Sequence, residues 1–459
     1  MQPAIEEADW AITEFGGADL GDARRTDRLV RLATVLGSRP QASLPQACDD
    51  PAELKAAYRF FQNEAIAPAA LLDSHVQATV ERVAAVPLVL AVQDTTEISW
   101  AATDQPALWV HSTLALTPER VALGLLAQET WTRPPEEAGK RATRRERPIE
   151  EKESHKWLSS VEAVNALTGG CPQTHLISVG DREGDVYDLF VLERAPGVDL
   201  LVRATQDRRL VAEDPAARKL RAAVAACPVA ATVTVAVPRQ GARTARQATL
   251  AVRFCPVALR APHARAAERL PDVALWAVWA HEVDAPAGAD PLDWLLLTTA
   301  AVQTAAAACE RLAWYACRWG IEVFHKVLKS GCSIERRQLE DLDHLQRCLT
   351  LYSVIAWRVL YATLLSRVGP DLPCTTLLEE SEWQALYCHI HHTTVLPDQS
   401  PTLTQAVRWI AQLGGYLGRK SDGPPGATVL WRGFQRLIDL TAMYHIFRPP
   451  YPRKNVGKD

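Results

Sequence analysis

The sequence has no pair of cysteines spaced as CxxC and no long uninterrupted apolar run. Its 10 cysteines are scattered over 459 residues, which indicates reduced thiols in the cytoplasm rather than a disulfide or zinc framework. The first twenty residues contain Glu6, Glu7, Asp9 and Glu14 and no apolar segment, so no signal peptide is expected. Charged residues break every apolar run well short of about 18 residues. These absences predict a cytoplasmic protein without a membrane partner.

An excess of positive charge is also missing. The chain has 50 Lys and Arg against 54 Asp and Glu, a formal net charge of −4, which weighs mildly against nucleic-acid binding. The basic residues are nevertheless clustered, and each cluster is either a solvated face or a phosphate-binding surface. The clusters are Arg24, Arg25, Arg28 and Arg31; Lys140, Arg141, Arg144, Arg145 and Arg147; and Arg203, Arg208 and Arg209. Three such clusters together favour phosphate binding.

The N-terminal part, residues 1–70, is predicted to be a small helical domain. Leu29, Leu32 and Val35 recur at helical spacing opposite the arginines of the first cluster. One helix is expected over residues 23–36 and a second over residues 51–63. A helix with a basic face suits docking on a DNA groove or backbone, and an ordinary amphipathic bundle is the alternative.

Residues 71–368 predict a mixed α/β domain. An apolar run over residues 85–93 is followed directly by Asp94, and another over residues 175–180 ends at Asp181. Further strands are expected at 107–117, 121–131 and 199–203, a helix at 157–167, and a charged loop at 134–153. Strands that end in aspartates place the acids where α/β sheets usually carry their sites.

A valine-rich segment with period-two alternation predicts an antiparallel, all-β insertion at about residues 205–299. Its strands are expected at 231–237, 247–259, 273–283 and 294–299. A long helix is expected to begin near Thr304, and residues 369–459 are predicted to form a C-terminal helical domain.

Four polar residues share one stripe of that long helix. Tyr315, Arg318, Glu322 and Lys329 are spaced by 3, 4 and 7 residues, which places them within about 60° of one another on a regular helix. Apolar residues flank the stripe, so the helix is largely embedded. The stripe is therefore either a solvated face or a site that handles phosphate and metal.

Asp94, Asp181 and Glu322 are the candidate catalytic carboxylates. Three acids brought together without a cation would repel one another, whereas a pair of Mg²⁺ ions, with Mn²⁺ able to substitute, favours oxygen ligands. Two such ions suit phosphodiester displacement. Either aspartate alone could instead be a turn or capping residue. A metal-free carboxylate hydrolase is disfavoured, because Arg318 and Lys329 suit phosphate better than sugar. Cys388–His392 is a second metal candidate, with core packing as the alternative.

With these residues the chain resembles the bacterial cut-and-paste DDE transposases of the transposon Tn-five group, within the insertion-sequence-four superfamily. The resemblance covers nearly the whole length and rests chiefly on the Tyr/Arg/Glu/Lys spacing. It also includes Leu20-Gly-Asp-Ala-Arg24-Arg25, Ala57-Tyr58-Arg59-Phe60, Asp94-Thr95-Thr96, Val110-His111-Ser112, Glu151-Lys-Glu-Ser-His-Lys156-Trp157-Leu158, Asp181-Arg182-Glu183, Trp294-Leu-Leu-Leu-Thr298 and Leu413-Gly414-Gly415. The chain departs from the family at Gly320 and Ile321, where a basic residue is common.

The resemblance implies a ribonuclease-H-like catalytic core, an N-terminal domain that recognises the transposon end and a C-terminal domain that pairs two subunits. Asp94, Asp181 and Glu322 would bind two metal ions, and Tyr315, Arg318 and Lys329 would hold DNA phosphates. Trp294 would stack on a flipped base. The remaining DNA-binding residues would be Arg24, Arg25, Arg28 and Arg59.

The implied activity is cleavage of transposon ends through a DNA hairpin, followed by joining of the 3′ ends to target DNA by a homodimer. Such a protein would be bacterial and associated with the nucleoid when bound to DNA. Two alternatives stay open. One is a domesticated or inactive relative that binds DNA without cutting it, and the other is a ribonuclease-H-like nuclease without strand transfer.

Overall fold

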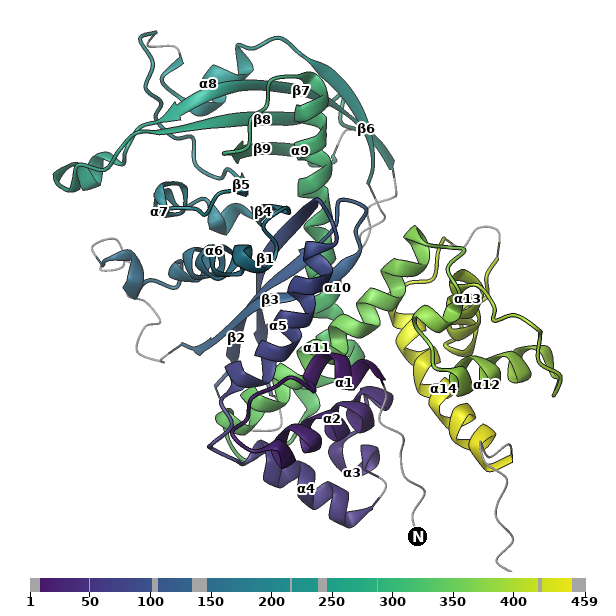
Figure 1. The fold of residues 1–459 in the computed structure, drawn as a ribbon. Coiled ribbons are helices and arrows are strands. Elements are labelled where there is room, and N and C mark those ends of the chain that lie inside the picture. The colour runs from purple at the N-terminus through teal and green to yellow at the C-terminus, as the bar shows by residue number, and fades with distance from the viewer. Residues whose placement is uncertain are drawn as a thin grey trace, which may run out of the picture.

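A nine-stranded mixed sheet runs through the centre of the computed structural model, which describes residues 9–48, 50–100, 106–133, 147–214, 217–237, 246–286, 288–419 and 423–447 (Figure 1). The strand order is β3-β2-β1-β4-β5-β9-β8-β7-β6. The strands are β1 (Leu88–Ile98), β2 (Leu108–Leu116), β3 (Ala122–Thr132), β4 (His175–Gly180), β5 (Val198–Arg203), β6 (Ala231–Val237), β7 (Arg246–Leu259), β8 (Val273–Val283) and β9 (Asp293–Thr298). The prediction of a mixed α/β fold is therefore confirmed.

Only β1, β4 and β5 are paired in parallel, and the remaining described pairs are antiparallel. The strands β6 to β9 extend the central sheet, because β9 pairs with β5. The expectation of an all-β insertion was wrong in detail, since the short helix α8 (Leu220–Ala225) lies within it. Its buried Leu220 and Val224 pack into the cluster beside β5, β7 and β8.

Five helices precede the sheet among the described residues: α1 (Asp9–Phe15), α2 (Ala23–Ser38), α3 (Leu44–Ala47), α4 (Pro51–Phe61) and α5 (Pro68–Ala84). Asp22 caps α2 through Arg24 N, and Asp50 caps α4 through Glu53 N, as short acidic side chains do at helix starts. Leu29, Leu32 and Val35 are buried. The two helices expected near residues 23–36 and 51–63 are thus confirmed.

The helices that cover the sheet lie on opposite faces. Trp157 of α6 (His155–Leu167) packs against His111, which pairs with Thr95 across β1 and β2. His325 of α10 (Trp319–Lys326) approaches Asp94, the residue before Thr95. Because successive strand residues point to opposite faces, α6 and α10 lie on different sides of β1 (Figure 1). The small helix α7 (Tyr187–Val191) packs with α6.

The longest helix, α11 (Leu342–Val368), passes through the core. It is long and apolar enough to cross a membrane by length and composition, but 78% of its most apolar window is buried inside the fold. That burial is what the core helix of a globular protein shows. Its side chains pack with α2, α4, α5 and β3 in the largest apolar cluster.

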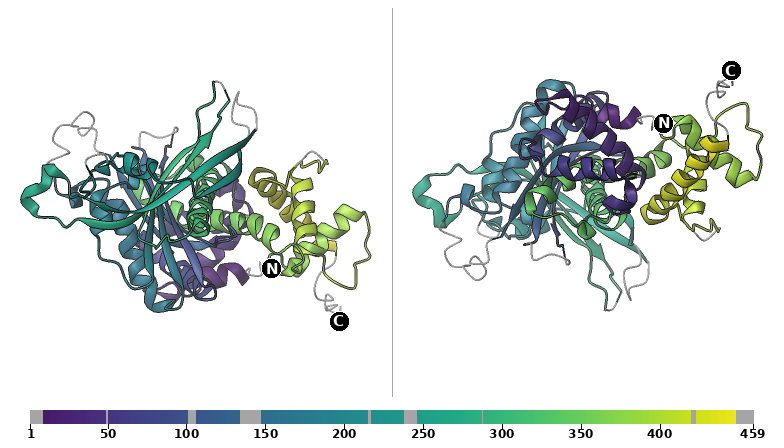
Figure 2. Two further views of the ribbon diagram at one scale, coloured as in Figure 1. Left: turned by 90° about the horizontal axis from the view of Figure 1, so that it is seen from above. Right: turned by 90° about the horizontal axis from the view of Figure 1, so that it is seen from below.

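Beyond α11 the chain forms a separate group of helices: α12 (Glu380–His391), α13 (Leu403–Leu413) and α14 (Ala427–Phe447). They share their own apolar cluster and lie to one side of the sheet in both views of Figure 2. The prediction of helices after residue 369 is confirmed. Of the second basic cluster, Lys140, Arg141, Arg144 and Arg145 fall outside the described residues, as does most of the loop expected at 134–153.

Candidate active site

Asp94 lies on β1, and Asp181 lies at the end of the neighbouring strand β4. Asp181 directly follows β4 and accepts a hydrogen bond from Glu183 N at 2.7 Å. The parallel ladder between β1 and β4 ends with Val92 opposite Val179, and the same offset carried two residues further places Asp94 beside Asp181. The prediction that Asp94 follows its strand was wrong, since β1 continues to Ile98 along β2. Asp94 instead lies just past the point where β1 loses its parallel neighbour.

The third carboxylate, Glu322, comes from a helical segment that is not one regular helix. Thr304 caps α9 (Ala305–Cys317), Arg318 joins it to α10, and a π turn follows at Val327–Gly331. Tyr315 is therefore on α9, Glu322 on α10 and Lys329 in the π turn. Gly320 lets α10 approach β2 closely, because a Cβ there would lie 2.8 Å from Leu116 Cδ1. The sequence predicted that all four residues share one stripe of a regular helix, and that prediction was wrong because the helix is divided after α9 and contains a π turn.

Arg318 contacts two of the three carboxylates. Its Nη1 lies 3.7 Å from Asp94 Oδ2, and its Nη2 forms an ion pair with Glu322. Burial alone lowers the pKa of Arg318, but Tyr315, Asp94, Glu322 and Asp181 outweigh burial and raise it. All three candidate carboxylates therefore lie within electrostatic reach of one guanidinium.

Asp94 carries the clearest electrostatic sign of a functional site. Burial, together with the charges of Asp181 and Glu322, raises its pKa to about 6 against the opposing effect of Arg318. A buried carboxylate whose pKa is raised by neighbouring acids is typical of sites that hold a proton or a cation. The three acids thus lie close enough to affect one site electrostatically.

The donor chemistry of this cluster fits Mg²⁺ or Mn²⁺, because all three side chains offer carboxylate oxygens. Within the described residues, however, no group of three or more His, Cys, Asp or Glu side chains is arranged as a ligand set. In the structure the Arg318 guanidinium lies beside the oxygens of Asp94 and Glu322. The residues fit the metal by chemistry, while the arrangement is that of an arginine-neutralised cluster.

The other predicted DNA-contacting residues are placed differently. Lys329 Nζ lies 3.7 Å from Glu335 Oε1. Tyr315 is only 5% exposed, and its ring meets that of Trp294 edge-on, with centroids 5.7 Å apart. Trp294 itself is partly buried on β9. The structure therefore joins Arg318 to the carboxylates and places Trp294 and Tyr315 together.

Sequence reasoning missed His325. Its Nδ1 lies 3.8 Å from Asp94 Oδ2, and its Nε2 has no hydrogen-bond partner among the described residues. Burial, with the charges of Lys329 and Arg318, lowers its pKa to about 3, so the ring is neutral. The signal was available, because His325 follows Glu322 by three residues and so shares its helix face.

The N-terminal arginines form a partly engaged surface. Arg24 and Arg59 are exposed, and Arg28 is half-buried. Arg24 pairs with Asp22 at 2.8 Å, whose pKa the hydrogen bonds from Arg24 lower to about 2. Arg25 Nη1 donates to Leu20 O at 2.8 Å. Arg28 lies on α2 and Arg59 lies on α4, both among the N-terminal helices.

Two other sequence candidates serve the fold. In the third basic cluster, Arg208 pairs with the buried Asp185, and Arg203 donates to Asp293 O at 2.7 Å. In the Cys388–His392 segment, His391 packs against Tyr387 and Trp409, with ring centroids 4.3 and 5.0 Å away. The described part of the chain shows no metal-binding group there.

Two family models match the ends of the chain. The model described as transposase DNA-binding matches residues 7–66, and the model described as transposase Tn5 dimerisation domain matches residues 354–446. The candidate carboxylates lie between the two matched ranges. Together the matches support a Tn5-like transposase that binds DNA and forms a homodimer.

Proposed function

We propose that the protein is a DDE transposase, in which Asp94, Asp181 and Glu322 catalyse the cleavage and joining of DNA strands. One observation carries the proposal. Three carboxylates from β1, from the end of β4 and from α10 meet around Arg318, and the pKa of Asp94 is raised to about 6. Regions that match DNA-binding and dimerisation models precede and follow the carboxylates in the sequence. These regions would bring DNA and a second subunit to such a site.

The central sheet supports a ribonuclease-H-like core of the insertion-sequence-four type. In the order β3-β2-β1-β4-β5, a three-stranded antiparallel meander leads into parallel strands. The acids lie on the central β1 and at the C-terminal end of its parallel neighbour β4. The strands β6 to β9 then separate this core from the helix that brings Glu322, so the insertion interrupts the catalytic domain without breaking its sheet.

Two Mg²⁺ ions, or Mn²⁺ in their place, would activate the attacking oxygen and stabilise the leaving oxygen. The protein's own residues prepare that site. Asp94 and Asp181 approach from the sheet, Glu322 approaches from the helix, and Arg318 neutralises the cluster until it meets DNA. Arg318 would then be available for a phosphate, which its planar guanidinium suits.

The proposed reaction is a series of in-line displacements at phosphorus. Water cuts one strand at the transposon end, and the freed 3′-hydroxyl attacks the opposite strand to close a hairpin. Hydrolysis opens the hairpin, and the 3′-hydroxyl then joins target DNA. Every step has the same geometry at phosphorus, so one carboxylate cluster serves all of them. Trp294, beside Tyr315, would stack on the base that hairpin closure extrudes.

A relative that binds DNA without cutting it is the second candidate. The pairing of Glu322 with Arg318 favours it, because this arrangement is not a metal ligand set. The two candidates differ in one property only, which is metal-dependent cleavage.

The deciding experiment compares the protein with Glu322→Gln on a plasmid that carries the terminal sequences of its source element. Glu162→Gln, which changes an exposed residue of α6, is the matched control. We expect hairpin-ended or blunt breaks with Mg²⁺ in the wild type and the control. We expect none with EDTA or with Glu322→Gln. Specific binding to these ends without cleavage by the wild type would establish the DNA-binding relative instead.

A further inference from the structure

A chain of buried hydrogen bonds crosses three strands beneath the carboxylates. Thr95 Oγ1 lies 2.9 Å from His111 Nδ1, His111 Nε2 lies 3.3 Å from Gln93 Oε1, and Gln93 Nε2 lies 2.6 Å from Ser178 Oγ. The four residues come from β1, β2 and β4. His111, Gln93 and Ser178 are no more than 2% exposed, so water does not compete for the two bonds among them, while Thr95 is half-buried.

The direction of each bond follows from the orientation of the Gln93 amide. The Gln93 amide nitrogen donates to Ser178, so its oxygen is the acceptor that faces His111. His111 must then carry its proton on Nε2, and its bare Nδ1 accepts the Thr95 hydroxyl proton. Burial and the nearby positive charge of Lys156 lower the pKa of His111 well below its usual range, in keeping with a neutral ring. One tautomer of His111 satisfies both neighbours.

This series of side-chain hydrogen bonds lies where the backbone hydrogen bonds between β1 and β4 end. The parallel ladder ends at Val92 and Val179, just before the level of Asp94 and Asp181. Gln93 and Thr95 flank Asp94 and point to the opposite face of the sheet. Gln93 reaches across to Ser178, three residues before Asp181. Side-chain bonds therefore continue the connection between the strands directly behind the two aspartates.

The same ring also connects to the turn that carries Asp181. His111 meets Trp157 edge-on, with ring centroids 4.8 Å apart. The Trp157 indole in turn lies against the backbone on both sides of Asp181. A Cβ added to Gly180 would lie 3.4 Å from it, and a Cβ added to Gly184 would lie 3.2 Å from it. His111 is thus hydrogen-bonded to the two residues that flank Asp94, and it packs on Trp157, which lies against the turn of Asp181.

We propose that His111 is a positioning residue that fixes the spacing of Asp94 and Asp181 through Gln93, Thr95 and Trp157. The inference rests on the proposed function, because it assigns the metal-binding role to these two aspartates. Groups that orient metal ligands from behind typically change metal affinity about 10–100-fold when they are removed.

The test measures Mn²⁺ binding by electron paramagnetic resonance, together with the Mg²⁺ concentration that gives half-maximal cleavage. His111→Leu removes both bonds, His111→Asn keeps an acceptor near Thr95, and Thr95→Val removes only the hydroxyl at almost constant shape. We expect weaker Mn²⁺ binding by roughly tenfold or more for His111→Leu. His111→Asn should recover part of the loss, and Thr95→Val should show a smaller one.

His75→Leu is the matched control. It removes another buried, hydrogen-bonded histidine, which contacts Leu125 of β3, two strands away from β1 in the sheet. It should lower the melting temperature without changing Mn²⁺ affinity. Unchanged Mn²⁺ affinity in both His111→Leu and Thr95→Val, in a wild type that binds Mn²⁺ and cleaves DNA, would overturn the inference alone. An equal loss in His75→Leu would also overturn it, as a general effect of destabilisation. A wild type that neither binds Mn²⁺ nor cleaves would remove the proposed function as well.

Discussion

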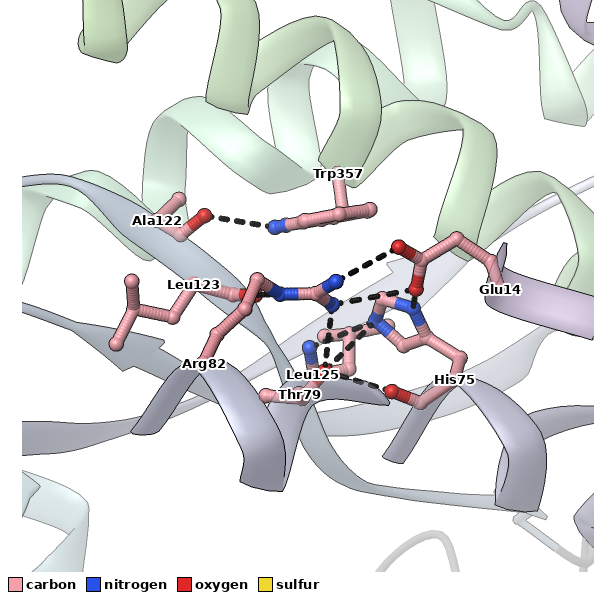
Figure 3. Close-up of polar contacts among 8 residues, drawn as sticks. All are labelled: Glu14, His75, Thr79, Arg82, Ala122, Leu123, Leu125 and Trp357. Carbon is pink, nitrogen blue, oxygen red and sulfur yellow. Dashed lines mark hydrogen bonds and ion pairs between the residues drawn. The ribbon is translucent and has the colours of Figure 1, made fainter. Parts of the chain in front are cut away.

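Glu14 Oε2 lies 2.5 Å from His75 Nδ1 in a pair that water does not reach (Figure 3). His75 Nε2 accepts the backbone N–H of Leu125 at 3.0 Å, so the ring proton sits on Nδ1 and points to Glu14. Arg82 Nη1 lies 2.8 Å from Glu14 Oε1. The guanidinium of Arg82, rather than the neutral imidazole, therefore balances the buried carboxylate.

This cluster ties together parts of the chain that are distant in sequence. Glu14 belongs to α1, His75 and Arg82 to α5, and Leu125 to β3. Arg82 also stacks on Trp357 of α11, with its guanidinium carbon 4.6 Å from the ring centroid. Gly124 makes the close approach of β3 and α5 possible, because its φ is +152° and a Cβ there would lie 1.9 Å from Thr79 Oγ1. The matched DNA-binding region is thus fastened to the sheet and to α11.

Low pH is expected to weaken the Glu14–His75–Arg82 cluster and so to lower the stability of the fold. Burial lowers the pKa of His75 from its ordinary 6.5, so below that value the unfolded chain takes up a proton that the folded chain refuses. Burial alone would raise the pKa of Glu14, but His75 and Arg82 lower it below 4.5. Both groups bind more protons when unfolded, so stability should fall from about pH 6.5 downward. Thermal unfolding measured against pH checks this.

The variants Glu14→Gln and His75→Leu should each flatten that pH dependence while lowering stability at neutral pH. Removing one partner of a buried charge pair typically costs about 3–5 kcal/mol, so the loss for Glu14→Gln should be large. Glu162→Gln should leave the profile unchanged. A wild type and a Glu14→Gln variant with parallel pH profiles would contradict this account.

Asp94 should reduce stability in the absence of metal. Burial, then the repulsion of Asp181 and Glu322, raises its pKa from 3.8 to about 6, so the folded state disfavours the charged form at neutral pH. This corresponds to about 1–3 kcal/mol. Asp94→Asn should therefore raise the free energy of unfolding in EDTA at pH 7.5, and the gain should fade as the pH falls from about 6 toward 3.8. Denaturant unfolding at several pH values measures it.

Two comparisons sharpen that measurement. Asp73→Asn, at an exposed position of α5, should give no such gain. Saturating Mg²⁺ should stabilise the wild type more than Asp94→Asn, because a ligand stabilises the state that binds it. A variant less stable than the wild type in EDTA at pH 7.5 would show that contacts of Asp94, such as that with Arg318, outweigh its desolvation.

The strands were largely predictable because alternation and apolar runs depend on local sequence. Residues 175–180, 231–237 and 273–283 match β4, β6 and β8. The end of β1 was not predictable in this way. Its parallel partner stops opposite Val92, whereas its antiparallel partner continues past Asp94. Which neighbouring strand continues to pair with β1 is determined by the whole sheet and not by local sequence. The polar residues from Asp94 to Glu97 were therefore not predicted to be part of the strand.

The helical stripe shows the same limit. Its period correctly brought Arg318 and Glu322 together, four residues apart. The π turn that carries Lys329 packs closely against α14, since a Cβ on Gly331 would lie 2.9 Å from Trp431 Cε3. A widened turn changes the angular position of the residues within and after it. The contact of Lys329 with Glu335 therefore could not be read from a spacing of seven residues.

Trp294 should affect hairpin closure more than the first cut. Base–aromatic stacking is worth about 1–3 kcal/mol, so Trp294→Ala should slow hairpin formation roughly tenfold or more while first-strand nicking persists. Trp294→Phe should restore part of the rate. Trp276→Ala is the control, because Trp276 packs against the same apolar cluster from the neighbouring β8. Denaturing gels of end-labelled DNA separate the two products.

Equal slowing of nicking and hairpin formation in Trp294→Ala would contradict a role in stacking. It would point instead to packing, because Trp294 meets Tyr315 in the structure. Tyr315→Phe distinguishes the two further, since it keeps the ring contact and removes only the hydroxyl that would reach a phosphate. We expect this variant to bind and cut DNA more weakly without preferential loss of hairpin closure.

Gly433→Ala should unfold the C-terminal helices selectively. The helices α13 and α14 meet backbone to backbone, because a Cβ on Gly433 would lie 1.7 Å from Ile410 O, and one on Gly414 would lie 1.7 Å from Val429 O. Separating them should cost at least about 2 kcal/mol. These helices have an apolar cluster of their own, so the sheet and the N-terminal helices should remain folded.

Hydrogen exchange followed by mass spectrometry should therefore show faster exchange confined to α12, α13 and α14. Gly423→Ala is the control, since a Cβ there would meet no atom within 4 Å. Because residues 354–446 match a dimerisation domain, Gly433→Ala should also lose the dimer in sedimentation experiments with DNA ends, while the monomer still binds DNA through residues 7–66. Retention of the dimer despite fast exchange in α13 and α14 would place the subunit contact on α11 rather than on the helices that follow it.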